Sequence, residues 1–356
     1  MDGSASEPKQ TAIAAVERVE VLFVQRRPTG AQVSMERLFD QVRQGLSTGV
    51  SWAIHICPHP SRGLVPRLRN LWSAWRASRG RICHLIGDVH YLALVLPRHR
   101  FVLTVHDCGV LHRLRGWRRE VVRLLWYVWP VRRAAVVTTI SETTREDLCR
   151  WLGPGLADKI QVVPNCVRAE FVPTPKAWDD AAPVILQVGT GWNKNLQRVG
   201  EALRGLACRW WIVGPVDTGQ RAVLESLELD FECLGKLSDV ALAETYQRCD
   251  LLVFVSLFEG FGLPILEAQA TGRPVITSDR SSMPEVAGDA AVLVDPENVP
   301  AIRAAVERVL AEPALRQSLV TRGFENVRRF QAEAVAARYE MIYRDLALGA
   351  SNRSPS

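Results

Sequence analysis

Two glutamates on either side of a short glycine-containing segment are the residues best placed to do chemistry. Glu259 and Glu267 bracket the spelling EGFGLPILE, which comes soon after the apolar run DLLVFVS at 250–256. Pro264 suits the first turn of a helix, because its missing N–H would be unpaired there in any case. A helix is therefore predicted to begin at about residue 263, with Glu259 before it and Glu267 one turn inside it. Both carboxylates can then face one cavity at different depths.

The start of this helix also has the features of a phosphate site. Gly260 and Gly262 allow the backbone to approach a ligand closely. The free N–H groups of Gly262 and Leu263, together with the helix dipole, attract an anion. On this interpretation one glutamate reaches a sugar and the other reaches a ribose. As a glutamate pair alone, the segment fits an ordinary strand-to-helix turn with two solvated carboxylates equally well.

The full spelling EGFGLPILE resembles the signature of glycosyltransferase family 4, in which two glutamates spaced E-x7-E flank a GFG turn. The resemblance covers nearly the whole chain. It implies a GT-B fold, a nucleoside-diphosphate sugar donor, transfer with retention of anomeric configuration, and no required metal or other cofactor. It also implies that Glu259 lies by the donor sugar and that Glu267 accepts from the ribose hydroxyls. The amides of Phe261, Gly262 and Leu263 would meet the sugar and the diphosphate.

A departing nucleoside diphosphate builds negative charge, and without a metal a protein cation has to stabilise it. Lys194 is the predicted cation, since it follows the apolar run PVILQVG at 183–189. Its segment, VGTGWNKNL, resembles the family motif GxxxxRKN, which implies that Gly189 and Lys194 belong to the donor site. Asn193 stands where the family has arginine, and a neighbour such as Arg198 is a candidate substitute. A lone lysine at a helix start is otherwise usually solvated.

Other segments resemble the family less specifically. Lys236 and Leu237 follow the third predicted strand of the second half, where family members hold the base through backbone contacts. PTGAQVSMERLF resembles the first glycine-containing loop, with Gly30 as the single glycine of the usual pair. TVHD places His106 at a strand end facing the cleft, where it can donate to a sugar hydroxyl, orient the acceptor, or merely cap a strand. VVPNCV resembles VPNGV, with Cys166 in place of the glycine.

Short β-branched runs alternate with amphipathic helical patterns twice along the chain, which predicts two doubly wound α/β domains facing a cleft. A proline-rich break separates them, and the last helical patterns cover 298–311 and 315–346. The C-terminal helix is expected to return to the first domain. The predicted boundaries are a flexible N-terminus at 1–17, a first domain at 18–172, a linker at 173–182, a second domain at 183–330, a C-terminal helix at 331–348 and a disordered tail at 349–356.

Length and composition fit two globular domains. The chain has 356 residues, of which 47% are hydrophobic and 23% charged. The first residues have no basic segment followed by an apolar one, and no apolar run approaches the roughly 20 residues of a spanning helix. The eight cysteines form no CxxC pair, which disfavours a zinc site and a disulfide framework. These features predict a cytoplasmic protein without bound metal.

Two arginine-rich segments of the first half also contain tryptophans. The arginines are Arg62, Arg67, Arg69, Arg76, Arg79 and Arg81, then Arg113, Arg115, Arg118, Arg119, Arg123, Arg132 and Arg133. The tryptophans are Trp72, Trp75, Trp117, Trp126 and Trp129. Basic amphipathic helices with tryptophans bind anionic membranes, which favours peripheral attachment to the inner leaflet. The alternative is that the tryptophans pack on the sheet and the arginines are a solvated face. Nucleic-acid binding is not expected, because no matching motif accompanies the charge.

The resemblance to glycosyltransferase family 4 implies a retaining hexosyltransferase. It would move a hexose, with mannose as one candidate, from a UDP- or GDP-linked donor to a sugar acceptor. A lipid-linked sugar is one candidate acceptor, and the process would be cell-surface polysaccharide synthesis. The alternative is a non-catalytic nucleotide-sugar-binding subunit of a synthesis complex, since Asn193, Cys166 and the first loop depart from the family pattern. A dehydrogenase is disfavoured, because no GxGxxG follows a predicted strand.

Overall fold

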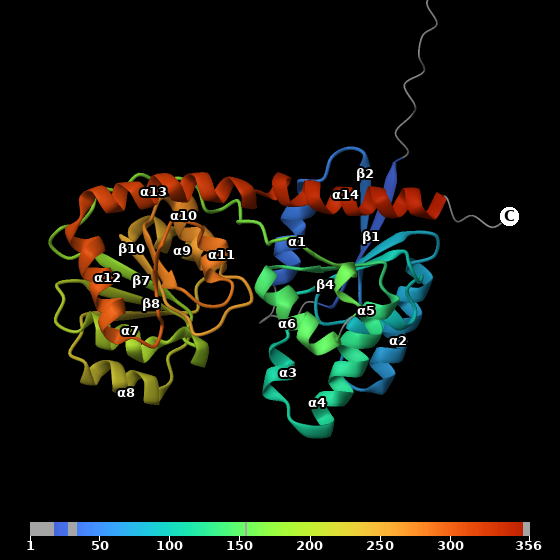
Figure 1. The fold of residues 1–356 in the computed structure, drawn as a ribbon, viewed down its shortest axis with the longest axis horizontal. Coiled ribbons are helices and arrows are strands. Elements are labelled where there is room, and N and C mark those ends of the chain that lie inside the picture. The colour runs from blue at the N-terminus through green and yellow to red at the C-terminus, as the bar shows by residue number, and fades with distance from the viewer. Residues whose placement is uncertain (1–17, 28–33, 154, 352–356) are drawn as a thin grey trace, which may run out of the picture.

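Two α/β domains lie side by side in the computed structural model of this protein (Figure 1). The structure describes residues 18–27, 34–153 and 155–351. The predicted N-terminal segment 1–17, Gly30, and residues 352–356 of the predicted tail lie outside the described residues. Each domain is built on a six-stranded sheet whose neighbouring strands are parallel, so the predicted doubly wound fold class is confirmed.

The first sheet has the strand order β2-β1-β3-β4-β5-β6. Its strands are β1 (Val19–Gln25), β2 (Val50–Ile56), β3 (Ile82–Leu85), β4 (Phe101–Val105), β5 (Val136–Thr139) and β6 (Ile160–Val162). Every residue of β3 and β4 is buried, because helices cover both faces of the sheet. The helical elements are α1 (Ser34–Gln44), α2 (Leu64–Ala77), η1 (His90–Leu94), α3 (Gly109–Arg113), α4 (Gly116–Val122), the π-helical η2 (Arg123–Val128), α5 (Trp129–Arg133), α6 (Glu142–Leu152) and η3 (Ala157–Lys159).

The second sheet has the order β12-β11-β10-β7-β8-β9. Its strands are β7 (Val184–Val188), β8 (Arg209–Val213), β9 (Phe231–Gly235), β10 (Leu251–Phe254), β11 (Val275–Ser278) and β12 (Val292–Val294). Its helical elements are η4 (Trp192–Lys194), α7 (Leu196–Leu203), α8 (Thr218–Ser226), α9 (Asp239–Arg248), α10 (Leu263–Thr271), α11 (Met283–Ala287) and α12 (Val299–Ala311). The direction of winding reverses between β7 and β10. Ligands of open α/β sheets bind beyond the carboxyl ends of the strands at such a reversal.

Two helices in red span both domains along the upper edge of Figure 1: α13 (Pro313–Val327) and α14 (Ala332–Ser351). The helical pattern over 315–346 is therefore interrupted by the 3-10 turn η5 (Arg328–Phe330), beside the boundary predicted after residue 330. In this turn the carbonyl of Phe330 accepts a hydrogen bond of 2.8 Å from the Val167 amide, which lies where the chain first leaves the first domain. The final helix also continues beyond residue 348, to Ser351.

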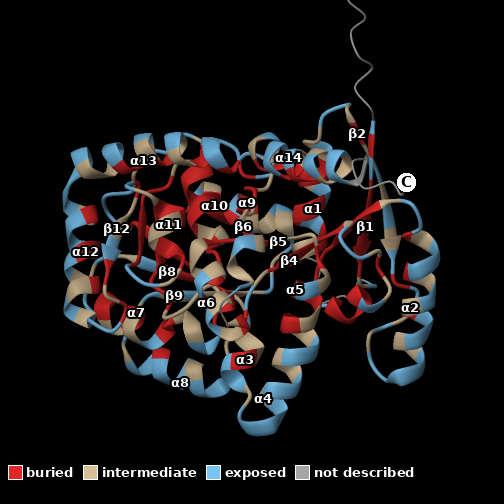
Figure 2. Ribbon diagram, turned by 45° about the vertical axis from the view of Figure 1, so that its right-hand side comes forward, coloured by how far each residue is buried: buried red, intermediate tan, exposed pale blue. Residues whose placement is uncertain are grey.

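Helix α14 packs into the core of the first domain, against α1, β1 and β3 (Figure 2). Tyr339 and Tyr343 are buried there. The Tyr343 hydroxyl lies 2.6 Å from His84 Nδ1, and the Thr104 hydroxyl lies 2.7 Å from His84 Nε2. Burial lowers the pKa of His84 to about 3, so this ring is neutral at pH 7. The predicted return of the C-terminal helix to the first domain is confirmed.

Candidate active site

Lys194 and Glu259 meet at the point where the winding of the second sheet reverses. Lys194 ends the short turn after β7, and Glu259 lies in the loop between β10 and α10. The Lys194 ammonium Nζ is 2.7 Å from Glu259 Oε1 and 4.5 Å from the centre of the Phe254 ring. The exposed fractions of the two side chains are 20% and 14%, so the pair is accessible to a ligand from one side.

Gly189 makes room for the lysine side chain. It has a φ of +94°, in the left-handed region that favours glycine. A Cβ at this position would lie 2.7 Å from Lys194 Cε and 3.1 Å from Lys194 Cδ. The aliphatic stem of Lys194 therefore passes directly over the Gly189 backbone, and this contact sets where the ammonium lies.

Asn193, which stands at the arginine position of the family motif, binds the glutamate loop. Its Nδ2 donates to Glu259 Oε1 at 3.1 Å and to the Phe258 carbonyl at 2.8 Å. Arg198, considered above as a substitute cation, donates to Asn195 Oδ1 at 3.1 Å. Arg198 also lines a cavity of about 300 Å³ whose lining includes neither Lys194 nor Glu259. Asn193 thus helps to fix the position of Glu259.

Two serines after β11 hold the backbone of the glutamate loop, although no sequence motif marks them. Ser281 Oγ donates to the Glu259 carbonyl at 2.6 Å. Ser282 Oγ lies 3.0 Å from the same carbonyl and donates to the Phe261 carbonyl at 2.7 Å. Their only signal in the sequence is the Ser-Ser pair that directly precedes α11. These contacts hold the loop in place before any ligand arrives.

The N-terminus of α10 begins as predicted, at Leu263. Gly262 is its N-cap residue, with a φ of +108°, a conformation that strains any other residue. Phe261 is buried, with its ring 5.9 Å from that of Phe330, and Leu263 packs against apolar residues of both domains. These two side chains anchor the turn, so the backbone amides are the groups that can bind an anion.

Glu267 is more deeply buried than Glu259, in agreement with the expected difference in depth. Its side chain is 5% exposed, and its Oε1 accepts from Arg168 Nη2 at 2.8 Å. Burial and the Glu267 carboxylate raise the pKa of Tyr246 well above its usual value, so the Tyr246 hydroxyl keeps its proton. No local motif identifies Arg168, because 99 residues separate it from Glu267.

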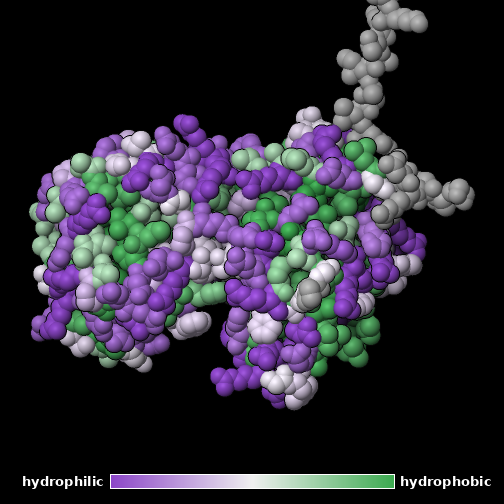
Figure 3. Space-filling view, viewed as in Figure 1, coloured by the Kyte–Doolittle hydropathy of each residue, from purple (hydrophilic) through white to green (hydrophobic). Residues whose placement is uncertain are grey.

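The first domain faces the glutamate loop directly, and Figure 3 shows the surface hollowed between the two domains. The Gly260 carbonyl accepts from Ser141 Oγ at 2.8 Å and from Thr144 Oγ1 at 3.2 Å. A Cβ on Gly260 would lie 3.1 Å from the His106 carbonyl. Gly260 therefore allows the two domains to touch beside Glu259.

His106 lies just beyond β4, beside this contact. Its Nε2 atom is buried and has no hydrogen-bond partner in the described structure. Burial lowers the pKa of His106 to about 4, so the ring is neutral at pH 7. A buried nitrogen without a partner costs free energy of folding. Such an atom beside the cleft is suited to a polar group of a ligand.

A second contact between the domains involves Glu285 of α11. Its two carboxylate oxygens accept from the backbone amide of Glu142 at 3.1 and 2.9 Å, at the first turn of α6. An acid at a helix N-terminus is favoured by the helix dipole. Burial nevertheless raises the pKa of Glu285. Glu285 therefore caps a helix of the opposite domain.

Two predicted donor-site residues, Lys236 and Leu237, are not brought to the Lys194–Glu259 pair by any contact of the described residues. Lys236 is exposed and Leu237 is half-buried, and both follow β9 at the edge of the sheet. Gly30 lies outside the described residues. Within the described ranges, no cluster of three or more His, Cys, Asp or Glu side chains is arranged to hold a metal, and no helix has the length and apolar character needed to cross a membrane.

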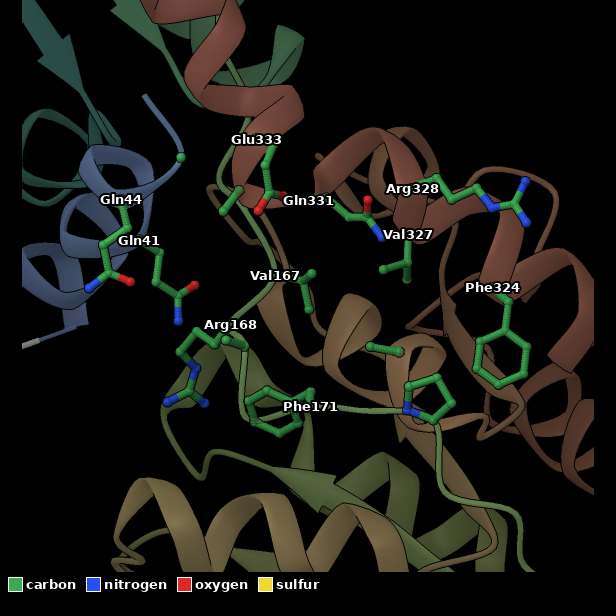
Figure 4. Close-up of a pocket in the computed structure, with 15 residues that line it drawn as sticks. Gln41, Gln44, Val167, Arg168, Phe171, Phe324, Val327, Arg328, Gln331 and Glu333 are labelled. Atoms are coloured by element: carbon green, nitrogen blue, oxygen red, sulfur yellow. The ribbon is translucent and has the colours of Figure 1, made fainter. Parts of the chain in front are cut away.

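A larger cavity, of about 810 Å³, lies where the chain crosses between the domains (Figure 4). Residues of both crossings line it, among them Val167, Arg168, Val327 and Gln331. Lys194 and Glu259 do not. This cavity is therefore separate from the candidate active site, although Arg168 takes part in both regions.

Comparisons with known proteins cover both domains. The family described as "Glycosyltransferase Family 4" matches residues 14–171, and the family described as "Glycosyl transferases group 1" matches residues 170–326. O-antigen chain mannosyltransferase B of Escherichia coli is 28% identical over 298 residues, which are 76% of this chain and 76% of that protein. O-antigen chain mannosyltransferase RfbU of Salmonella typhimurium is 25% identical over 261 residues, covering 69% and 71% of the two chains.

Solved structures agree on the fold. Sucrose-phosphate synthase from Thermosynechococcus elongatus superimposes with a TM-score of 0.74 at 18% identity, covering 93% of this chain and 100% of that one. Anabaena HepE in complex with UDP superimposes with a TM-score of 0.72 at 13% identity, covering 91% and 99%. Together the two family matches span nearly the whole described structure. The chain therefore belongs to glycosyltransferase family 4 and is a glycosyltransferase with the GT-B fold, as the E-x7-E segment predicted.

Proposed function

We propose that this glycosyltransferase is a retaining hexosyltransferase that uses a UDP- or GDP-linked sugar without a metal. The observation that carries the proposal is the 2.7 Å contact between Lys194 and Glu259 beside the start of α10. A cation, a carboxylate and free helix amides thus lie together where the sheet reverses. The cation and the amides suit the diphosphate of a nucleotide-sugar donor, Glu259 suits its sugar, and Glu267, one turn inside α10, suits its ribose.

The reaction follows from these positions. A donor brings two phosphates to the amides of Gly262 and Leu263, and Lys194 leaves Glu259 to bind them. Glu259 is then free to accept from the sugar hydroxyls and to stabilise the positive charge that develops at the anomeric carbon. The acceptor hydroxyl attacks on the same face as the departing diphosphate and gives its proton to the oxygen that leaves, so the configuration is retained. Holding both sugars in reacting geometry can remove about 7–11 kcal/mol of the barrier.

The proposed sugar and pathway are supported by relatives. Both O-antigen relatives are named as mannosyltransferases, and one structural neighbour was solved with UDP. We therefore propose mannose as the first sugar to test, a growing surface polysaccharide as the process, and a sugar acceptor carried on a lipid. His106, beside the cleft, is proposed to contact the acceptor or the transferred sugar. The backbone at Lys236 and Leu237 is proposed to hold the base, and Gly30 to approach the donor.

Donor screening tests the proposal. UDP- and GDP-linked hexoses are added one at a time, and the melting temperature is measured. A donor present at 100 times its Kd stabilises the folded state by about 2.7 kcal/mol. The stabilising donor is then used in a transfer assay with and without EDTA, and the anomeric configuration of the product is read by NMR. Stabilisation without turnover on any lipid-linked sugar would favour the non-catalytic alternative, and an inverted product would refute retention.

We also propose that the arginine-rich helices of the first domain hold the enzyme against an anionic membrane. On α2, Leu64, Leu68 and Trp72 are exposed, and on α4 so is Trp117. Arginines stack on these tryptophans: the Arg76 guanidinium lies 4.9 Å from the Trp72 ring centre. Figure 3 shows hydrophobic surface in the region of α2. Trp126 and Trp129, in contrast, pack against the core of the first domain, as the alternative of sheet-packed tryptophans expects.

Flotation with lipid vesicles checks the membrane proposal. The protein is expected to float with vesicles containing an anionic lipid and to stay in solution with zwitterionic ones. Each cation near the surface contributes about 1 kcal/mol, so Arg76→Gln with Arg79→Gln should weaken binding by roughly thirtyfold. Arg221→Gln with Arg308→Gln is the matched control, because both are exposed helix arginines of the second domain. Equal flotation with both lipid types would count against the proposal.

A further inference from the structure

Arg168 connects two carboxylates on different elements of the second domain. It lies between β6 and β7, on the segment that carries the chain from the first domain to the second. Its Nη2 donates to Glu267 Oε1 at 2.8 Å, and its Nη1 donates to Asp239 Oδ1 at 2.9 Å. The guanidinium also lies 4.7 Å from the centre of the Phe171 ring, next to which Figure 4 places it. Three contacts therefore fix the arginine plane.

The contact with Arg168 controls the orientation of Glu267 because both side chains are buried. The Glu267 side chain is only 5% exposed and that of Arg168 only 13%. A buried carboxylate without a cation is strongly disfavoured, and removing one partner of a buried pair leaves the other uncompensated. A planar guanidinium can serve two carboxylates at fixed angles, which a lysine ammonium does not do. Arg168 therefore sets the direction of the Glu267 carboxylate.

Asp239 extends the connection to the first domain. Its Oδ1 accepts from Arg168, and its Oδ2 forms an ion pair with Arg37 of α1. Asp239 itself lies at the start of α9, two residues beyond Leu237. The arginine that holds Glu267 is thus itself held by a residue that contacts both domains.

We infer that Arg168 is a positioning residue that orients Glu267 toward the ribose hydroxyls of the donor. This inference rests on the proposed function, in which Glu267 accepts from the ribose. It assigns to Arg168 a part in recognising the nucleoside, although the arginine does not touch the ligand. Its contribution to affinity passes through the ribose hydroxyls and disappears when they are removed.

The test compares a nucleotide with its hydroxyl-free analogue. The Kd values of UDP and 2′,3′-dideoxy-UDP, and of GDP and 2′,3′-dideoxy-GDP, are measured by calorimetry for the unchanged protein and for Arg168→Met. For the nucleotide that binds, the unchanged protein is expected to prefer the ribose form at least tenfold. Arg168→Met should reduce that preference to below about threefold while binding the dideoxy form as the unchanged protein does. Arg168→Lys should give an intermediate ratio.

Each outcome has a separate meaning. Arg37→Met is the matched control, because it removes a cation from Asp239 and none from Glu267; its ribose preference should be unchanged. If the unchanged protein binds both forms equally, the ribose role of Glu267 in the proposed function fails. If the unchanged protein discriminates and Arg168→Met discriminates as well, or weakens both forms alike, the inference about Arg168 is overturned. Should Arg168→Met fail to fold, full discrimination in Arg168→Lys overturns it.

Discussion

Replacing Glu259 by alanine is expected to abolish nearly all transfer while the donor still binds, at least as tightly as before. Glu259 accepts from both Lys194 and Asn193, so its removal releases the Lys194 ammonium for the diphosphate. Transfer, in contrast, depends on a carboxylate beside the sugar as positive charge develops there. Loss of one fixed electrostatic partner typically lowers turnover by about 10²–10³-fold. Calorimetry of donor binding and initial rates of transfer measure the two effects.

Two further variants show whether the loss of transfer is specific to Glu259 and whether it is due to its charge. Glu297→Ala is the matched control, because Glu297 is an exposed glutamate of the same domain that pairs with Arg280; neither binding nor turnover should change. Glu259→Gln keeps the shape of the side chain and removes its charge. It should be as inactive as the alanine variant if charge is what matters. Unchanged turnover in Glu259→Ala would exclude this residue from the chemistry.

Replacing Lys194 by alanine is expected to weaken donor binding and turnover together. The ammonium binds the diphosphate before the reaction and stabilises the charge that grows on it during departure. Removing a donor of this kind costs about 3 kcal/mol, roughly a hundredfold in kcat/KM. Glu259 also loses its cation, so it becomes an unpaired carboxylate next to an anionic ligand. Donor titrations and steady-state kinetics at several donor concentrations separate KM from kcat.

Gly189→Ala tests the position of this lysine without removing its charge. The added Cβ would lie 2.7 Å from Lys194 Cε, so the side chain must move. The expected loss has the same direction as that of Lys194→Ala. Gly205→Ala is the matched control: Gly205 has a φ of +73°, and a Cβ there meets no atom within 4 Å. It strains the backbone similarly without displacing a side chain. Equal activity in both glycine variants would show that lysine placement is unimportant.

The sequence predicts the strands well because their burial is nearly complete. A run such as FVLTV is apolar at every position except Thr104, and only a strand covered on both faces has that pattern. The 3-10 turn at Arg328–Phe330 lies at the boundary placed after residue 330, but the helical period continues through it and gives no local signal for a turn. There the carbonyl of Phe330 bonds to Val167, a partner far away in the sequence. Tertiary contacts, rather than local preference, end α13.

The candidate site also contains some residues that the sequence identifies and others that it does not. Glu259, Gly262 and Leu263 lie within one strand-to-helix turn, so their spacing alone places them. Lys194 could be assigned by its motif, but its contact with Glu259 depends on β7 and β10 being neighbours, which no local pattern states. Arg168, Ser281 and Ser282 act from other segments and have no signature of their own.

The helical periodicity of the sequence does not determine which tryptophans are exposed. Trp72 and Trp126 occur in similar basic helical patterns, yet Trp72 is exposed and Trp126 packs against the core. The π-helical turn η2 contains Trp126 and changes the angular step between side chains there. A prediction based on a regular helix therefore cannot assign each ring to a face.

The hydrogen bonds of the Gly260 carbonyl bear on the hydrolysis of a bound donor by water. This oxygen, one residue after Glu259, is bonded by hydroxyls of the opposite domain, Ser141 and Thr144. When the two halves of the enzyme swing apart, both bonds are exchanged for water, and the segment carrying the carboxylate is held by its own domain alone. The hydroxyls of Ser141 and Thr144 therefore add to the second-domain contacts of this loop only while the two halves are together. On the proposed function, a donor bound while the halves are apart would meet a glutamate loop without this support and would react more slowly with water.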